Sequence, residues 1–352
     1  MKPNNLMRYI LFFFILAACQ TSKNQLAPTA TSQAPSIATS TIVTTKPIPT
    51  LTIVPTPTET EITVGQIAYA HVEAISEGIG PRAAGTEAEA KTAQYIVLEF
   101  EKLGYVSELH PFTATVKGNT INSANVIAIK RGASPLEIIV GAHYDSVSVG
   151  ESADDNASGV AVILEVARRI KDQQTPYTIR FVLFGAEEVG MQGSQYYVDQ
   201  MTAEQIQNTI GMINLDSVTA GDIAYIYGDE GERGAIRDWA LDFAEENGLA
   251  LQTQLGENPE YPRGTTGDWS DHAPFKSIGI PYTYLESTNW TLGKKDGYTQ
   301  VSTEYGEDGE IWHTEYDTLD FINTTFPGRV QERLNLFVVV LEAILTEFSI
   351  AK

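Results

Sequence analysis

The strongest constraint on the fold is an alternation of short apolar segments with segments of helical periodicity. The runs Leu136–Ala142, Thr178–Phe184 and Gly211–Asp216 are largely apolar and have polar residues around them, as expected of strands buried on both faces. Between the first two runs, apolar residues over 159–170 recur at helical spacing. This alternation predicts a three-layer α/β/α sandwich with a mainly parallel, mixed central sheet.

Capping signals add helix boundaries to this prediction. Thr86 and Glu89 have the spacing of a capping box, so we expect a helix over Ala88–Leu103 that ends at Gly104. Further helices are expected over 234–247 and 328–348, and a further strand over 223–227.

The N-terminus differs in composition from the rest of the chain. Residues 1–18 carry Lys2 and Arg8 ahead of an apolar run that is too short to span a bilayer, which is typical of a secretory signal peptide. Cys19 follows Leu-Ala-Ala, and this boundary resembles the lipobox of bacterial lipoproteins. We therefore expect an extracytoplasmic protein, lipid-anchored to the cell membrane through Cys19. The alternative is a free thiol after an ordinary signal peptide or membrane anchor.

Residues 19–65 are rich in Thr, Pro and Ser and contain no aromatic residue, so we expect a disordered tether ahead of a folded domain over 66–352. The chain has one cysteine, which excludes an intramolecular disulfide framework and a thiolate zinc finger. Its net charge of −22 disfavours nucleic acid as a partner. Any metal must therefore be held by His, Asp and Glu.

Acidic and histidine side chains follow one predicted strand after another. Because the carboxyl ends of parallel strands meet at one edge of a sheet, we expect these side chains to lie together. They are His143 and Asp145 after the first strand, Asp155 before the next helix, Glu187 and Glu188 after the second strand, and Asp216 at the end of the third.

Carboxylates crowded at one edge repel one another, and a divalent cation relieves that repulsion. Histidine and carboxylate ligands favour zinc or a related transition metal over calcium. His313 offers a further ligand, and the adjacent pair Glu187 and Glu188 can divide the work between metal and water. The alternative for each single acidic residue is a solvated rim or a helix cap. His71 and His110 lie in no motif and are expected to be structural or exposed, whereas His272 is intermediate.

Six motifs stand in order along the chain. They are Gly141-Ala-His-Tyr-Asp-Ser146, Ala153-Asp-Asp-Asn-Ala-Ser-Gly159, Gly185-Ala-Glu-Glu188, Asn214-Leu-Asp216, Ser270-Asp-His-Ala-Pro-Phe275 and His313-Thr-Glu-Tyr-Asp-Thr318. Together they resemble the di-zinc aminopeptidases of metallopeptidase family twenty-eight, which include secreted bacterial leucyl aminopeptidases. The opening Ile79-Gly-Pro-Arg-Ala-Ala-Gly85 is also similar.

The resemblance implies a ligand set for two zinc ions. Asp155 would bridge both ions, His143 and Asp216 would complete one site, and Glu188 and His313 would complete the other. It also implies a cis peptide between Asp155 and the following asparagine.

The same resemblance implies the catalytic roles. Glu187 would be the general base, taking a proton from a metal-activated water and passing it to the leaving amine. Asp145 would accept a hydrogen bond from His143 and fix its tautomer. Several relatives have a tyrosine ahead of the last histidine, where this chain has Trp312. The expected substrates are peptides with a free N-terminus, and the expected state is a monomer.

Other functions remain open at this point. A metallocarboxypeptidase would need a cationic pocket, for which Arg263 is a candidate. The glutaminyl cyclases of this superfamily resemble single-zinc sites without the first histidine, so His143 together with Asp155 argues against that reaction. A non-enzymatic binding lipoprotein would have lost Glu187 or a ligand, and none is missing.

Overall fold

The computed structural model describes residues 63–302, 305 and 308–350. The expected signal peptide and nearly all of the expected tether lie outside these residues. Eight strands form one sheet in the order β1-β2-β4-β3-β5-β8-β6-β7. The strands are β1 Ser107–Val116, β2 Asn119–Lys130, β3 Ser134–His143, β4 Tyr177–Phe184, β5 Thr209–Leu215, β6 Ile223–Gly228, β7 Leu251–Gln252 and β8 Tyr282–Thr288.

The sheet is mixed, with its parallel strands at the centre. Strands β4, β3, β5 and β8 are parallel neighbours, and β7 is parallel to β6. Antiparallel pairing joins β1 to β2, β2 to β4 and β6 to β8. The predicted α/β class with a mixed central sheet is confirmed.

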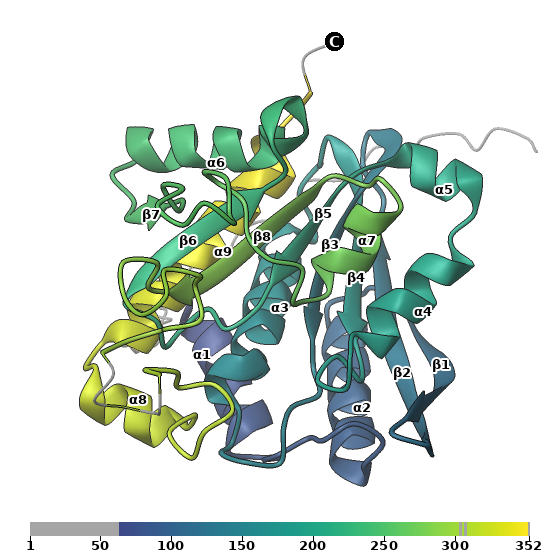
Figure 1. Ribbon diagram of the computed structural model, residues 1–352. Helices are drawn as coiled ribbons and strands as arrows, with labels where there is room; N and C mark the ends of the chain where they lie inside the picture. Colours follow the sequence, from purple (N-terminus) through teal and green to yellow (C-terminus); the bar gives the residue numbers. More distant parts are fainter. Residues whose placement is uncertain (1–62, 303–304, 306–307, 351–352) are drawn as a thin grey trace, which may run out of the picture. The chain divides into compact units, whose positions relative to one another are not determined.

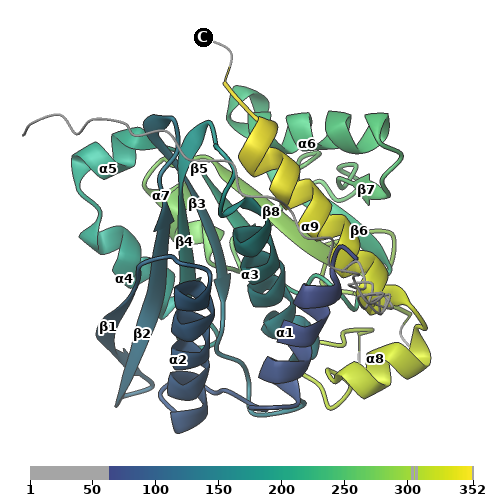
Figure 2. The same ribbon diagram turned by 180° about the vertical axis from the view of Figure 1, so that it is seen from behind.

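Helices cover both faces of the sheet. Figure 1 shows α4, α5 and α7 on one face, and Figure 2 shows α1, α2, α3 and α9 on the other. The helices are α1 Gln66–Ser76, α2 Glu87–Lys102, α3 Gly159–Ile170, α4 Gln192–Gln200, α5 Ala203–Asn208, α6 Ala235–Glu246, α7 His272–Ser277, α8 Leu319–Thr325 and α9 Arg329–Glu347, with an irregular turn at Ala153–Ser158 and a short 3₁₀ turn at Gly231–Gly234.

The central strands β3, β4 and β5 are mostly apolar because each face packs against a helical layer. In β3, Ile138 and Val140 belong to the core shared with α1, α2, α3 and α9. Ile139, which points to the other face, packs with Phe275 of α7 and Val198 of α4. Each fully buried side chain of this kind stabilises the fold by roughly 1.5–3 kcal/mol.

Helix α3 is buried on nearly every side, which goes beyond its predicted amphipathic pattern. It packs against β3, α1, α2 and α9, and ten of its twelve residues are buried. Helix α2 departs from the prediction at its start. Thr86 accepts from the Glu89 N–H at 3.3 Å, but the Glu89 carboxylate accepts from Gly85 instead of returning to Thr86. The reciprocal half of the capping box is therefore absent there.

Candidate metal centre and active site

The predicted site residues gather at the carboxyl ends of β3, β4 and β5. All of them except Asp145 line a cavity of about 140 Å³, together with aromatic side chains and residues from two loops. The loops are the turn at Ala153–Ser158 and the segment before α8. The lining residues are His143, Asp155, Glu187, Glu188, Asp216, Ser217, Trp269, Tyr284, Glu286, Gly297, Tyr298, Trp312 and His313.

Asp155 lies between the two histidines and turns one carboxylate oxygen to each. Its Oδ1 is 3.1 Å from Nε2 of His143, and its Oδ2 is 3.1 Å from Nε2 of His313. Asp216 Oδ1 lies 3.3 Å from the same His143 nitrogen, and Glu188 Oε2 lies 2.9 Å from the same His313 nitrogen. The five residues thus form two clusters that share Asp155.

This arrangement fits zinc. Tetrahedral zinc binds nitrogen and oxygen ligands at about 2.0–2.2 Å, which places neighbouring ligand atoms roughly 3.3 Å apart. The contacts from both histidines are close to that spacing. His143, Asp155 and Glu188 also bring one ligand atom each within 4.8 Å of one another. The donor set of imidazole and carboxylate suits the same metal.

The electrostatics of the site favour added positive charge. Hydrogen bonds to Asp155 and Glu188 raise the pKa of His313 to about 11. Burial would lower the pKa of His143, but Asp216 and other carboxylates raise it well above its usual value. A divalent cation bound between these groups would stabilise the charge of the carboxylates in place of protons on the two histidines.

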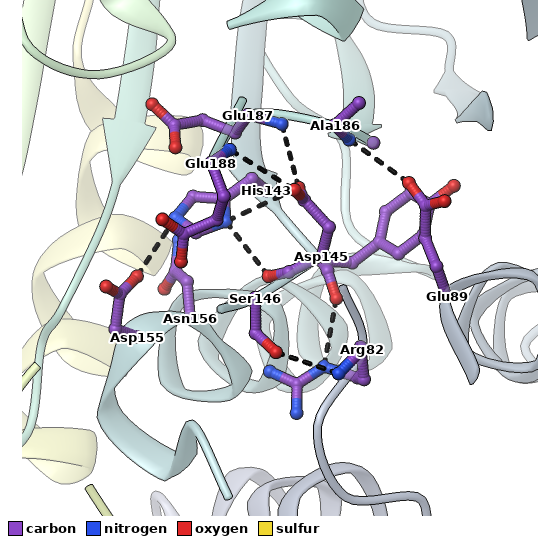
Figure 3. Close-up of polar contacts among 12 residues, drawn as sticks. Arg82, Glu89, His143, Asp145, Ser146, Asp155, Asn156, Ala186, Glu187 and Glu188 are labelled. Carbon is purple, nitrogen blue, oxygen red and sulfur yellow. Dashed lines mark hydrogen bonds and ion pairs between the residues drawn. The ribbon is translucent and has the colours of Figure 1, made fainter. Parts of the chain in front are cut away.

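Asp145 holds the start of the loop that carries the two glutamates. Its Oδ1 accepts from the Glu187 N–H at 2.9 Å, and its Oδ2 accepts from the Glu188 N–H at 3.2 Å (Figure 3). The Nδ1 atom of His143 is 3.2 Å from the main-chain oxygen of Asp145 and 3.7 Å from its carboxylate. The closer contact to the imidazole is therefore made by the main chain, and it leaves Nε2 facing Asp155 and Asp216.

Glu187 faces the same cavity without contacting either histidine at salt-bridge distance. Burial raises the pKa of Glu187 well above its usual value, and the nearby charge of Asp271 raises it further. Asp271 is fully buried at the start of α7. The sequence motif contained Asp271, but nothing in the sequence indicated this proximity.

Several other polar residues of the motifs hold the ligands in place. Ser270 donates its hydroxyl to Asp216 Oδ2 at 2.7 Å and accepts from the Asn214 amide at 2.8 Å. Asp317 accepts the main-chain N–H groups of Asp154 and Asp155 at 2.7 and 3.1 Å. These contacts leave Asp216 Oδ1 and the Asp155 carboxylate directed to the histidines.

The turn that carries Asp155 is also tied to the rest of the edge. The Asp154 carboxylate accepts from the N–H groups of Thr219 and Ala220 and from the Gln300 amide. The Asp155–Asn156 peptide is cis, as expected. The Asn156 amide donates to the Leu215 carbonyl at 2.8 Å.

Arg82, from the motif Ile79–Gly85, connects loops that surround the site. It is fully buried, and its guanidinium donates at 3.0 Å to the carbonyls of Gly80, Tyr144, Glu151 and Ser152. Burial lowers its pKa to about 10, so the group stays charged at neutral pH. Figure 3 shows Arg82 next to Ser146 and Asp145. Arg82 thus connects the segment after β3 to the turn that bears Asp155.

Arg82→Met is expected to lower the free energy of unfolding by about 3 kcal/mol or more, because buried carbonyls lose charged donors. Urea unfolding at neutral pH measures the change. Arg131→Met, at an exposed arginine, is the matched control and should shift stability little. Equal effects of the two substitutions would contradict this role for Arg82.

The other three histidines and Arg263 lie outside the ligand clusters. His272 is buried between the rings of Tyr282 and Tyr284, at centroid distances of 4.8 and 4.9 Å. His71 pairs with a tyrosine hydroxyl, and His110 is exposed on β1. Arg263 is exposed and does not line the cavity. Trp312 does line it, with its ring edge-to-face against Tyr298 at 5.4 Å.

Comparison with known proteins supplies the family. The family model described as Peptidase family M28 matches residues 125–338. The chain belongs to this peptidase family. The alkaline phosphatase isozyme conversion protein of Escherichia coli K12 is 33% identical over 81% of this chain and 91% of its own length.

Two further relatives are longer proteins. Aminopeptidase YwaD of Bacillus subtilis is 32% identical over 57% of this chain, and the probable lipoprotein aminopeptidase LpqL of Mycobacterium tuberculosis is 33% identical over 61%. This chain spans 41% and 44% of their lengths.

Solved structures agree on the fold. The zinc aminopeptidase BSAP of Bacillus subtilis superposes with a TM-score of 0.65 at 20% identity, over 81% of this chain and 96% of that one. The glutaminyl cyclase of Porphyromonas gingivalis superposes at 0.61 and 21% identity, over 81% of this chain and 99% of that one. Family membership and the His, Asp and Glu cluster indicate a zinc-type peptide hydrolase.

Proposed function

We propose that this chain is a di-zinc aminopeptidase that removes N-terminal residues from peptides. The observation that carries the proposal is the position of Asp155, which presents one oxygen to each of two histidine-carboxylate clusters. His143 and Asp216 would hold one zinc ion with Asp155, and Glu188 and His313 would hold the other. Zinc bound there would supply Lewis-acid chemistry, polarising a peptide carbonyl and acidifying water.

Glu187 is the general base in this proposal. Its partly buried position and raised pKa suit a carboxylate that accepts a proton from the attacking water and delivers it to the peptide nitrogen that leaves. Asp145 supports both glutamates by fixing their main-chain N–H groups.

The charge of the cavity favours a free N-terminus over a C-terminus as the recognised end. Five carboxylates line it, and among the described residues no Lys or Arg does so. An ammonium group is attracted to such a lining, whereas a substrate carboxylate is repelled. Arg263, the sequence candidate for carboxylate recognition, lies elsewhere.

The test is hydrolysis of aminoacyl anilides and N-blocked peptides by the purified protein, before and after chelation and return of zinc. Cleavage of free-amine substrates alone, lost with chelator and restored by zinc, is the expected result. Cleavage of N-blocked peptides alone would contradict the proposal and indicate a carboxypeptidase or endopeptidase. Conversion of N-terminal glutamine to pyroglutamate without hydrolysis would indicate a cyclase instead.

We also propose that residues 1–18 are a lipoprotein signal peptide and that 19–65 tether the peptidase domain, 66–352, to a membrane through lipidated Cys19. The relative LpqL, which is named a probable lipoprotein aminopeptidase, supports this arrangement. In the described part of the chain, no helix has the length and hydropathy to cross a bilayer.

Cys19→Ala is expected to remove lipid labelling in a bacterial host and to move the protein out of the membrane fraction. Acyl chains on the cysteine supply the membrane affinity, so the variant loses it while the peptidase domain is unchanged. Radiolabelled palmitate incorporation and fractionation measure the effect. Cys19→Ala protein that stays labelled and sediments with membranes would refute the anchor.

A further inference from the structure

Glu286 is a buried carboxylate in the cavity that neither ligand cluster uses. It lies in β8 beside the end of β5, is 1% exposed and lines the cavity. Tyr227 donates to its Oε2 at 3.0 Å, and Tyr284 lies 3.4 Å from its Oε1. Trp290 in turn donates to the Tyr227 hydroxyl at 2.6 Å. The carboxylate is therefore held in place from behind by neutral groups.

No cationic side chain pairs with Glu286 among the described residues. An ionised carboxylate has about four acceptor positions, so the tyrosines leave room for further donors. A buried charge is costly unless it is paired. Two zinc ions held by Asp155, Glu188 and Asp216 would leave Glu187 and Glu286 as the lining carboxylates that bind no metal.

Aromatic rings form other parts of the same lining. Trp269, Tyr298 and Trp312 contribute to the wall, and the first two are 38% and 54% exposed. Such rings pack against the methylene groups of long basic side chains and interact with guanidinium and ammonium groups. A cavity with a buried carboxylate and exposed aromatic rings is suited to bind a long side chain that ends in a positive charge.

We propose that Glu286 is the specificity-determining residue of this cavity and pairs with the basic side chain of a substrate's N-terminal arginine or lysine. This inference rests on the proposed aminopeptidase function. The charge of the side chain would meet Glu286, while its methylene groups contact the aromatic wall.

The experiment compares arginine, lysine, norleucine and methionine anilides with the zinc-loaded full-length protein and its Glu286→Gln variant. The wild type should prefer arginine and lysine over norleucine by about tenfold or more in kcat/KM, and the variant should lose that preference. Its kcat/KM for norleucine and methionine should fall much less than its kcat/KM for arginine and lysine. Glu315→Gln, at an exposed glutamate near His313, is the control for charge and should change neither.

Two results would overturn the inference. A wild type that shows no preference for basic residues would do so. A uniform loss on all four substrates in Glu286→Gln would also do so, because it would assign the carboxylate to the α-ammonium group or to the fold.

A binding measurement separates this inference from the proposed function. Calorimetry with argininamide and norleucinamide measures binding affinity even if the protein hydrolyses no anilide. Argininamide should bind about tenfold more tightly than norleucinamide to the wild type and equally to Glu286→Gln. Equal affinities in the wild type would contradict the role of Glu286 whatever the reaction.

Discussion

Glu187→Gln is expected to lower kcat/KM for peptide hydrolysis by about 10²–10⁴-fold while zinc stays bound, because a positioned base typically contributes that much. The side chain lines the cavity, but both histidines contact Asp155 and other carboxylates. The main-chain N–H of Glu187 donates to Asp145, and the substitution keeps this contact. Steady-state kinetics and elemental analysis of the purified variant measure the two effects.

Glu315→Gln again serves as the control, since it removes an exposed glutamate close to the site without entering the cavity lining. A Glu187→Gln enzyme with most of its activity would exclude Glu187 as the general base. A variant that loses zinc along with activity would make Glu187 a ligand instead.

Asp155→Ala is expected to lose zinc as well as activity, and to be the more damaging of the two changes. Its carboxylate is the only group that contacts both histidines in the described part of the chain, so both clusters lose a ligand at once. Removing one ligand commonly costs a metal site most of its affinity. Zinc content per chain, measured after dialysis against a weak chelator, checks this.

Asp155→Asn refines the same experiment. An asparagine keeps one carbonyl oxygen and places an amide where the second oxygen was, so it can serve one cluster but not both. We expect its zinc content to lie between those of the wild type and Asp155→Ala. Full zinc occupancy in Asp155→Ala would refute the shared carboxylate.

The sequence predicted the centre of the sheet well because its strands are buried on both faces, and continuous apolar runs report that directly. Two other strands were harder. The edge strand β1 is exposed over most of its length, and the inner strand β8 consists of Tyr, Thr, Leu, Glu and Ser. A strand like β8 is buried because its polar groups find partners from distant segments, such as Tyr227 for Glu286. Periodicity within one segment does not contain that information.

The same limit applies to the site. His143, Asp155 and Glu188 stood out because they follow strands, and the structure brings them together. Arg82 and Asp317 lay within recognised motifs, but their work is to hold main-chain groups of other loops, which spacing along the chain does not reveal. Glu286 lay in no motif at all.

The packing of α3 has a thermodynamic consequence. The helix begins at Gly159, immediately after the turn that presents Asp155, and it is enclosed by α1, α2, α9 and β3. Zinc that binds the native turn and not the unfolded chain must stabilise the native state by the free energy of its binding. Because folding and metal binding are linked, the converse also holds. A core substitution that leaves a cavity beneath α3 should weaken metal binding to the extent that it loosens the turn. If the site holds zinc as proposed, the melting temperature should rise with the free zinc concentration.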